Sequence, residues 1–265
     1  ALLGSMVLQG KNFFYDNPLS SRRMRYDWHV CPCCVGNIPR TLLMVPTWTY
    51  VKSETGIYVN MYIGSIIKVE KVAGTNVEMV QKTDYPWSGK VSITVNPETS
   101  ARFTMHVRVP DRKTSDLYTP VPEVNTLKSL SVNGEAVPVN IVKGYAEIMR
   151  EWKKGDVIAF EMPMEVQVIT ADERIQADRG RVALRYGPMI YNVEKADRQD
   201  INGRMGSTPL TAEWKPRMLG GIIAVSGTWA DGSPLLAVPN FVRLNRQVER
   251  AEGDRAPTSI VWMRR

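Results

Sequence analysis

Short runs of alternating apolar and polar residues, separated by turn residues, fill the sequence after residue 55 and restrict the fold most. In residues 102–109 apolar side chains occupy every second position, which predicts a half-buried strand. Residues 91–95 repeat this alternation, and the turn residues 96–100 separate the two runs. Asn133-Gly134 lies between apolar residues, which is typical of a β-hairpin. Many short strands joined by turns predict a mainly β chain of the β-sandwich class.

Further strands are predicted where β-branched and aromatic residues cluster, at residues 57–63, 157–162, 165–170, 182–186 and 189–193. Polar loops are predicted at residues 111–125 and 196–216. The stretch 162–172 separates two strand-rich halves. We therefore expect two successive β domains.

One segment has a helical pattern instead. In residues 37–45, Asn37 suits an N-cap position and Pro39 suits the first turn. The apolar residues that share one face of this helix are Ile38, Leu42 and Val45. Pro46 predicts that the helix is kinked or ends before Trp48.

The charge balance is basic, with 34 Lys and Arg against 27 Asp and Glu, a net charge of +7 and an isoelectric point of about 9.3. The densest basic cluster is residues 22–25, and the other basic residues are scattered. Without a recognised motif this pattern does not predict nucleic-acid binding; an acidic polysaccharide or solubility accounts for it equally well. No apolar run reaches about 18 residues, and no signal peptide is visible, so we expect no membrane association.

The cysteines Cys31, Cys33 and Cys34 are the only ones in the chain and lie within four residues. Such clustering favours metal binding or nucleophilic chemistry over structural disulfides. Adjacent thiolates suit a borderline cation such as zinc, and His29 adds a fourth donor. So short a segment closes a tetrahedral site poorly, so further ligands would come from elsewhere; His106 is the only other histidine. Partly buried free thiols are the alternative, and the residue types leave both interpretations open.

An aromatic loop at residues 84–87 (Asp-Tyr-Pro-Trp) could stack on sugar rings or anchor the edge of a domain. Packing is the favoured interpretation. The sequence singles out no pair of carboxylates for acid and base catalysis. It also contains no glycine-rich phosphate loop and no GxSxG motif.

As an ordered set, several motifs resemble the C-terminal portion of glycoside hydrolase family 127 and its relatives in family 146, formerly a domain of unknown function. They are FFYDNPL at 13–19, CPCCVGN at 31–37 with Arg40, GIYVNMYIGS at 56–65, DYPW at 84–87 with GKV at 89–91, WKKGD at 152–156, DRGRVALRYGPMIY at 178–191, AVPN at 237–240 and LNR at 244–246. The match covers nearly the whole chain.

The resemblance implies a fold and a set of domains. Members of the family are longer and begin with an (α/α)6 barrel, which is followed by two β-sandwiches. Residues 1–50 would then be the C-terminal remnant of that catalytic barrel. Residues 51–163 would form the first β-sandwich and residues 164–265 the second, so the chain would be part of a longer parent.

The resemblance also implies an activity, which is that of a retaining β-L-arabinofuranosidase with a cysteine nucleophile held on zinc. By motif position, Cys33 would be both nucleophile and zinc ligand, and Cys34 a second ligand. The remaining ligands and the general acid/base lie upstream in the family, so no residue here receives those roles. The expected substrate is an oligosaccharide, an arabinofuranoside or related plant cell-wall glycan. The sequence does not fix the compartment, and both the periplasm and the cytoplasm of a glycan-degrading bacterium stay open.

A second hypothesis needs no catalysis. The chain could be a β-sandwich module for domain packing, dimerisation or carbohydrate binding. The dimer expected under this hypothesis is a homodimer formed through a β-sandwich domain. Separately, without barrel partners, apolar side chains of residues 1–50 would be bare or would pair with another copy; examples are Leu2, Phe13, Phe14 and Leu42. On either hypothesis, we expect this chain by itself to be inactive.

Overall fold

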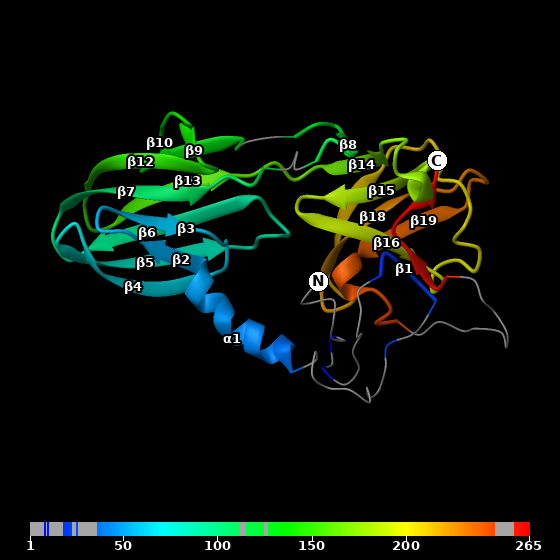
Figure 1. Ribbon diagram of the computed structural model, residues 1–265, viewed down its shortest axis with the longest axis horizontal. Coiled ribbons are helices and arrows are strands. Elements are labelled where there is room, and N and C mark those ends of the chain that lie inside the picture. The colour runs from blue at the N-terminus through cyan, green and yellow to red at the C-terminus, as the bar shows by residue number, and fades with distance from the viewer. Residues whose placement is uncertain are drawn as a thin grey trace. The chain divides into compact units, whose positions relative to one another are not determined.

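The computed structural model describes residues 8, 10, 18–22, 25, 36–111, 115–124, 127–246 and 257–265. The chain forms two compact units. The middle unit comprises residues 40–114 and 124–164, and the C-terminal unit comprises residues 1–39, 115–123 and 165–265. Both consist mainly of strands (Figure 1), so the predicted β class is confirmed. The predicted boundaries after residues 50 and 163, and the barrel remnant, stay predictions.

The middle unit contains two sheets. The six-stranded sheet has the order β10 (Glu135–Ala136), β9 (Ser129–Val132), β13 (Asp156–Glu161), β6 (Lys90–Pro97), β5 (Thr75–Thr83) and β4 (Ser65–Val72). The five-stranded sheet has the order β11 (Ile141–Val142), β12 (Tyr145–Trp152), β7 (Ala101–Arg108), β3 (Gly56–Val59) and β2 (Tyr50–Lys52). The pairs are antiparallel except β3 with β7, which is parallel. Five of these strands were not predicted from the sequence: β2, β4, β5, β11 and β12.

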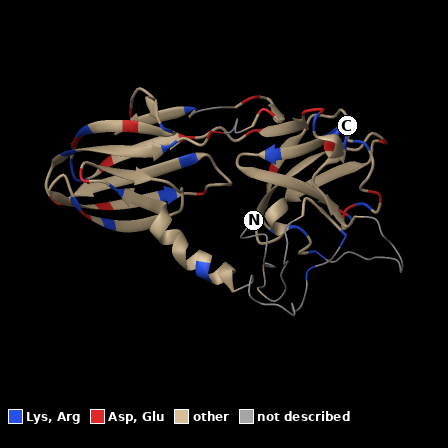
Figure 2. Ribbon diagram, in the orientation of Figure 1, with Lys and Arg blue, Asp and Glu red and all other residues tan. Residues whose placement is uncertain are grey.

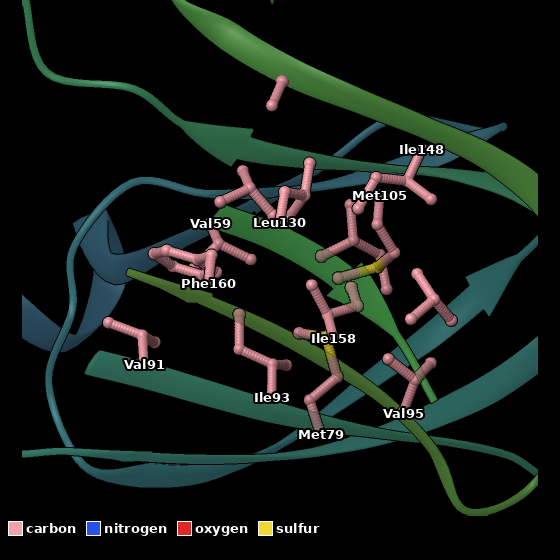
Figure 3. Packing of buried hydrophobic residues seen from close by; sticks show 14 of the residues in the cluster. Val59, Met79, Val91, Ile93, Val95, Met105, Leu130, Ile148, Ile158 and Phe160 are labelled. Carbon is pink, nitrogen blue, oxygen red and sulfur yellow. The ribbon is translucent and has the colours of Figure 1, made fainter. Parts of the chain in front are cut away.

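The core of the middle unit is formed by the inward positions of both sheets, as the alternation predicts (Figure 3). Ile93 of β6, Met105 of β7 and Ile158 of β13 have no exposed surface. At the edge of this core, Trp152 is also fully buried and donates its Nε1–H to the carbonyl of Phe103 over 3.0 Å. Each such side chain contributes about 1.5–3 kcal/mol through burial of its apolar surface.

The predicted hairpin turn is confirmed. Asn133 and Gly134 join β9 to β10, and both have positive φ, 53° and 83°. A turn with positive φ at both central residues matches the twist of the strands it joins, and Asn-Gly adopts it readily.

Helix α1 (Asn37–Thr49) lies where a helix was expected but passes through Pro46, so the predicted end before Trp48 is wrong. Hydroxyl groups bond to carbonyls in the turn that contains the proline: Thr47 Oγ1 to the Met44 carbonyl at 2.7 Å, and Thr49 Oγ1 to the Val45 carbonyl at 3.0 Å. The face predicted to be apolar is the less exposed one; Ile38 is buried.

The described residues of the C-terminal unit form ten strands in one hydrogen-bonded sheet. Its main path is β17 (Thr211–Lys215), β18 (Ile222–Thr228), β19 (Pro234–Pro239), β16 (Met189–Glu194), β15 (Arg181–Tyr186), β14 (Val166–Ala171) and β8 (Tyr118–Val121). Three short strands join it from the side: β1 (Ser20–Ser21), β20 (Ser259–Ile260) and β21 (Met263–Arg264). Among the described residues, Gln176–Asp178 (η2) and Asn240–Val242 (η3) form 3-10 turns.

Strand β16 changes partner along its length. Its first residues pair with β15, its middle residues with β19 and its last residues with β20. Because β20 also pairs with β1, the end of β16 connects to residues near the start of the chain.

Two predicted loops contain strands, so those parts of the prediction are wrong. Residues 111–125 include β8, which pairs with β14 in the C-terminal unit. Residues 196–216 include β17, which pairs with β18. Both strands are largely exposed at a sheet edge, so their sequences carry little apolar alternation.

Basic and acidic residues are interspersed over the described parts of each unit (Figure 2). Within those parts, the chain has no helix of the length and apolarity needed to span a membrane.

Candidate functional site

The cysteine motif is the predicted centre of the site, and it lies outside the described residues. Cys31, Cys33, Cys34 and His29 all fall between Arg25 and Gly36. The roles of Cys33 and Cys34 as nucleophile and zinc ligands therefore stay predictions. The structure does describe residues on both sides of the motif.

On the N-terminal side, residues 18–22 are attached to the C-terminal unit. Strand β1 pairs antiparallel with β20, with Ser20 opposite Ile260 and Ser21 opposite Ser259. The Ser21 carbonyl accepts from Thr258 N at 2.6 Å and from Thr258 Oγ1 at 2.9 Å. Ser21, Thr258, Ser259 and Ile260 are all buried, so water does not compete for these bonds.

A buried carboxylate lies at the end of β16. Glu194 has no exposed surface and accepts three bonds: from Leu244 N at 2.7 Å, and from Arg246 Nε at 3.1 Å and Nη2 at 2.8 Å. Arg246 also donates Nη1 and Nη2 to the two oxygens of Asp197, each at 2.7 Å. Burial raises the pKa of Glu194, and the charge of Arg246 opposes this shift. The carboxylate thus fixes both the backbone and a side chain of residues 244–246.

Arg243 joins this cluster to the N-terminal residues. Its side chain is 1% exposed and donates Nη1 to the carbonyl of Pro18. Its own carbonyl accepts from Arg25 Nε at 3.2 Å and Nη2 at 2.9 Å. Burial, together with the positive charge of Arg243, lowers the pKa of Arg25 to about 10, whereas Glu194 acts in the opposite direction.

This cluster was not predicted from the sequence. Residues 244–246 stood out only as part of a motif, and no role was expected for Glu194 or Arg243. A usable signal was present, since Arg243 lies between two apolar residues and Arg246 follows three positions later in the run Phe-Val-Arg-Leu-Asn-Arg at residues 241–246. Charged residues in such a context are buried only when paired.

On the C-terminal side of the motif, α1 begins at Asn37. This helix exposes large apolar side chains: Leu43 is 79% exposed, Met44 44% and Trp48 43%. Such a face is typical of a surface that packs against another protein body.

His106, the other histidine, lies on β7 opposite the core, as the alternation predicts. Its Nδ1 is 3.3 Å from Glu147 Oε1, and its ring stacks on Tyr58. Within the described part of the chain, no three His, Cys, Asp or Glu side chains form a group that could hold a metal. Adjacent thiolates such as Cys33 and Cys34 do suit zinc chemically, but the described residues supply no further cluster of ligands.

The aromatic loop at residues 84–87 packs against its own domain, which is the interpretation favoured from the sequence. Tyr85 lies edge-on to Tyr62 with ring centroids 5.9 Å apart and contacts the core of the middle unit. Trp87 is half-buried, and its backbone N–H closes a turn by donating to the Asp84 carbonyl at 2.8 Å.

A cavity of about 550 Å³ lies on the outer face of the six-stranded sheet. Its lining is mostly small or polar and includes Lys82, Ser92, Ser131 and Glu161. The one aromatic residue in this lining, Phe160, is 3% exposed, so the cavity has no aromatic platform for a sugar ring.

Comparisons with known proteins place these domains among glycoside hydrolases. Residues 56–164 match the family model "Beta-L-arabinofuranosidase, GH127 middle domain", and residues 166–252 match the "Glycoside hydrolase family 127 C-terminal domain". The two models lie end to end and together span most of the chain. The chain belongs to glycoside hydrolase family 127, of which it carries the middle and C-terminal domains.

Individual relatives agree with this. The chain is 26% identical over 277 residues to the non-reducing end beta-L-arabinofuranosidase of Bifidobacterium longum subsp. longum, covering 97% of this chain and 38% of the relative. The crystal structure of Ara127N-Se, a GH127 beta-L-arabinofuranosidase from Geobacillus stearothermophilus T6, superposes with a TM-score of 0.83 and 28% identity, over 99% of this chain and 44% of that one. The structure of the GH127 beta-arabinofuranosidase BT3674 superposes with a TM-score of 0.86 and 27% sequence identity. The match covers 99% of this chain and 43% of that one. The chain therefore spans less than half the length of these relatives.

Proposed function

We propose that the chain is the C-terminal part of a retaining glycoside hydrolase that cleaves β-linked L-arabinofuranosides of plant cell-wall glycans. The observation that carries this proposal is the match of both β domains to the GH127 models, whose flanking sequence here contains the paired Cys33 and Cys34. The relatives named above are β-arabinofuranosidases.

In this proposal the Cys33 thiolate attacks the anomeric carbon of the sugar. A carbon–sulfur bond forms as the glycosidic carbon–oxygen bond breaks, and an acid outside this sequence protonates the departing oxygen. Water then attacks the same carbon, its proton is taken up by the conjugate base, and Cys33 leaves as thiolate. Two inversions at one carbon retain the configuration.

Cys33 must be a thiolate to react, because the thiol is a weak nucleophile. Cys33 and Cys34 are the residues of this chain that would hold a zinc ion. A bound zinc would keep both thiols deprotonated at neutral pH. Cys31 receives no role, which makes it a matched control within the same motif.

The test is made on the full-length protein with an aryl β-L-arabinofuranoside. Cys33→Ser should abolish turnover and Cys34→Ser should lower zinc content, while Cys31→Ser should keep both. Mass spectrometry of a trapped glycosyl adduct should place it on Cys33. Full activity of Cys33→Ser would overturn the proposal.

A second candidate function is supported by the exposed apolar face of α1. Leu43, Met44 and Trp48 suit a module that packs against another body, either the rest of a longer protein or a second copy. Under this proposal residues 1–265 alone fold but do not hydrolyse the substrate. Zinc-dependent turnover by residues 1–265, lost in Cys33→Ala, would contradict it.

A further inference from the structure

We propose that one face of the C-terminal unit carries a glycan-binding site for a sugar that bears a carboxylate group. The site consists of a cavity rich in arginine and a pair of stacked aromatic rings beside it. Binding there breaks no bond, so the inference goes beyond the proposed function and does not rest on it.

The cavity has a volume of about 390 Å³, which is within the range of small-molecule sites. It lies where β14 and β15 meet the last residues of the chain, beside the end marked C in Figure 1. The charged residues of its lining are Arg179, Arg181, Arg265, Glu173 and Asp178. Three guanidinium groups against two side-chain carboxylates leave the cavity positive, which favours an anionic ligand.

Two of the arginines are oriented by backbone carbonyls. Arg179 donates Nε to the Glu173 carbonyl at 2.8 Å, and Arg181 donates Nη1 to the Trp262 carbonyl at 3.0 Å. A guanidinium group has five N–H donors, so each side chain is held by one bond and keeps further donors for a ligand. The planar fork of such donors matches the two oxygens of a carboxylate.

The acidic residues of the lining indicate a sugar and not a bare anion. Burial raises the pKa of Asp178, and the charge of Arg181 opposes this shift, so both groups share a space from which water is partly excluded. Partial exclusion of water strengthens the attraction between an arginine and an anion. The carboxylates of Asp178 and Glu173 accept hydrogen bonds from hydroxyl groups, which a sugar supplies and an inorganic ion lacks.

The aromatic pair lies next to the cavity. Tyr118 of β8 is paired with Ala171 of β14, which lines the cavity, and paired residues of adjacent strands point to the same face. Trp262 is joined to the cavity through the bond from Arg181 to its carbonyl. The rings of Tyr118 and Trp262 stack with centroids 5.8 Å apart and planes 30° from parallel, and Tyr118 is 39% exposed. A partly exposed ring that rests on a second ring is a rigid platform for the apolar face of a sugar.

The experiment measures binding to the full-length protein by isothermal titration calorimetry at one ionic strength. The probe is digalacturonic acid, and its methyl ester is the comparison, because the ester keeps the sugar rings and loses the charge. We expect the ester to bind at least about tenfold more weakly, since hydrogen bonds to charged groups are stronger than those to neutral groups. Arg181→Gln and Tyr118→Ala should each weaken binding of the acid about tenfold. Tyr118→Phe, which keeps the ring, should bind as the wild type does.

Three control variants should keep the wild-type affinity for the acid. Arg174→Gln removes an arginine of the same loop that is bound to Asp172 at 2.7 Å and is not part of the cavity lining. Trp214→Ala removes a ring on β17 that is 46% exposed. Lys82→Gln removes a cation from the larger cavity of the middle unit. Circular dichroism checks that every variant is folded, and Arg179→Gln replaces Arg181→Gln if the latter unfolds.

Equal affinity of wild type, Arg181→Gln and Tyr118→Ala for the acid would overturn the inference, as would equal affinity for the acid and its ester. Absence of binding by the wild type would also overturn it. Weakening in Lys82→Gln alone would place the ligand in the other cavity. Displacement of the disaccharide by an equal concentration of acetate would show that the site binds an anion without a sugar, which contradicts the inference. Because binding is measured without turnover, a protein that hydrolyses no arabinofuranoside leaves this test intact.

Discussion

The ring of Tyr58 lies flat on the imidazole of His106, with centroids 3.9 Å apart and planes 3° from parallel. These residues face each other across the parallel pair β3–β7. Gly56 begins β3, and a Cβ at this position would lie 2.8 Å from the Thr104 carbonyl oxygen and 2.9 Å from His106 Nε2. The close approach of β3 and β7 therefore depends on the absence of a side chain at Gly56.

Gly56→Ala should destabilise the protein by about 1–3 kcal/mol, since the added methyl forces the backbone of β3 away from β7. Urea unfolding measures this. Gly64→Ala is the control, because its Cβ would meet only the Gln81 carbonyl oxygen at 3.9 Å and needs no movement. Equal urea midpoints for Gly56→Ala and Gly64→Ala would show that β3 can move away from β7 without loss of stability.

His106 should make stability depend on pH. Burial lowers the pKa of His106 below 6.5, and Glu147 only partly offsets this. The unfolded chain then binds the proton more readily than the folded chain, so this contribution to stability is complete above pH 6.5 and is lost as pH falls through the folded pKa. The unfolding free energy of the wild type should decline as the pH is lowered from 7.5 to 5. The unfolding free energy of His106→Gln should decline less over the same range. An unchanged slope in that variant would assign the dependence to other groups.

The sequence predicted the middle unit better than the C-terminal unit, for a physical reason. Where a strand has one side in the core, as in residues 102–109, apolar alternation is strong and the prediction is confirmed. Strand β8 has no such signal, since its four residues are mostly exposed and include Pro120. Its position is set by pairing with β14, a contact between residues about 50 apart that no local pattern contains.

The candidate site shows the same contrast between local and long-range features. The motif around Cys33 is visible because it is local, with its chemistry contained in four adjacent positions. The residues that bind its flank are not local: Arg243 and Pro18 are 225 positions apart, and Glu194 reaches Arg246 across 52. Such partners are identified only once the fold brings them together.

Gln167 should anchor β8 to the C-terminal unit. It has no exposed surface, donates Nε2 to the Pro122 carbonyl at 2.6 Å and accepts from Arg185 Nε at 2.8 Å. Gln167→Leu removes both bonds in a buried place, so it should cost about 1–3 kcal/mol. Amide hydrogen exchange in residues 118–121 should accelerate. The control Thr170→Val, on the same strand, removes only a 3.4 Å contact to Thr119 and should leave exchange unchanged.

The exposed face of α1 should contribute little to the stability of this chain. Leu43→Lys places a charge where the side chain is already 79% exposed, so the unfolding free energy should change by no more than about 0.5 kcal/mol. Ile38→Lys, on the buried face, should cost about 2 kcal/mol or more, because it removes a buried apolar side chain. Sedimentation velocity tests the predicted pairing of two copies: if they associate through this face, Leu43→Lys shifts the chain to monomer. A dimer that persists in Leu43→Lys would exclude this face as the contact.

Asp156 should support the middle unit at neutral pH and lose that effect in acid. Burial alone would raise the pKa of Asp156, but hydrogen bonds from Asn133 Nδ2 and Lys153 N, each 2.9 Å, lower it below 3.8. The folded state therefore binds this proton less readily than the unfolded state. Its contribution is present above the unfolded pKa and is lost as pH falls through the folded pKa.

Asp156→Asn should flatten the stability profile between pH 5 and pH 2, and it should lower the unfolding free energy at pH 7 because the charged acceptor is lost. Asp116→Asn, at an exposed turn, is the control and should reproduce the wild-type profile. Because Asn133 bridges β9 to β13 through Asp156 and through Val157 N, exchange of the Val157 amide should quicken in Asp156→Asn as the turn loosens. If the stability of Asp156→Asn depends on pH as steeply as that of the wild type, these hydrogen bonds do not lower the pKa of the Asp156 carboxyl group.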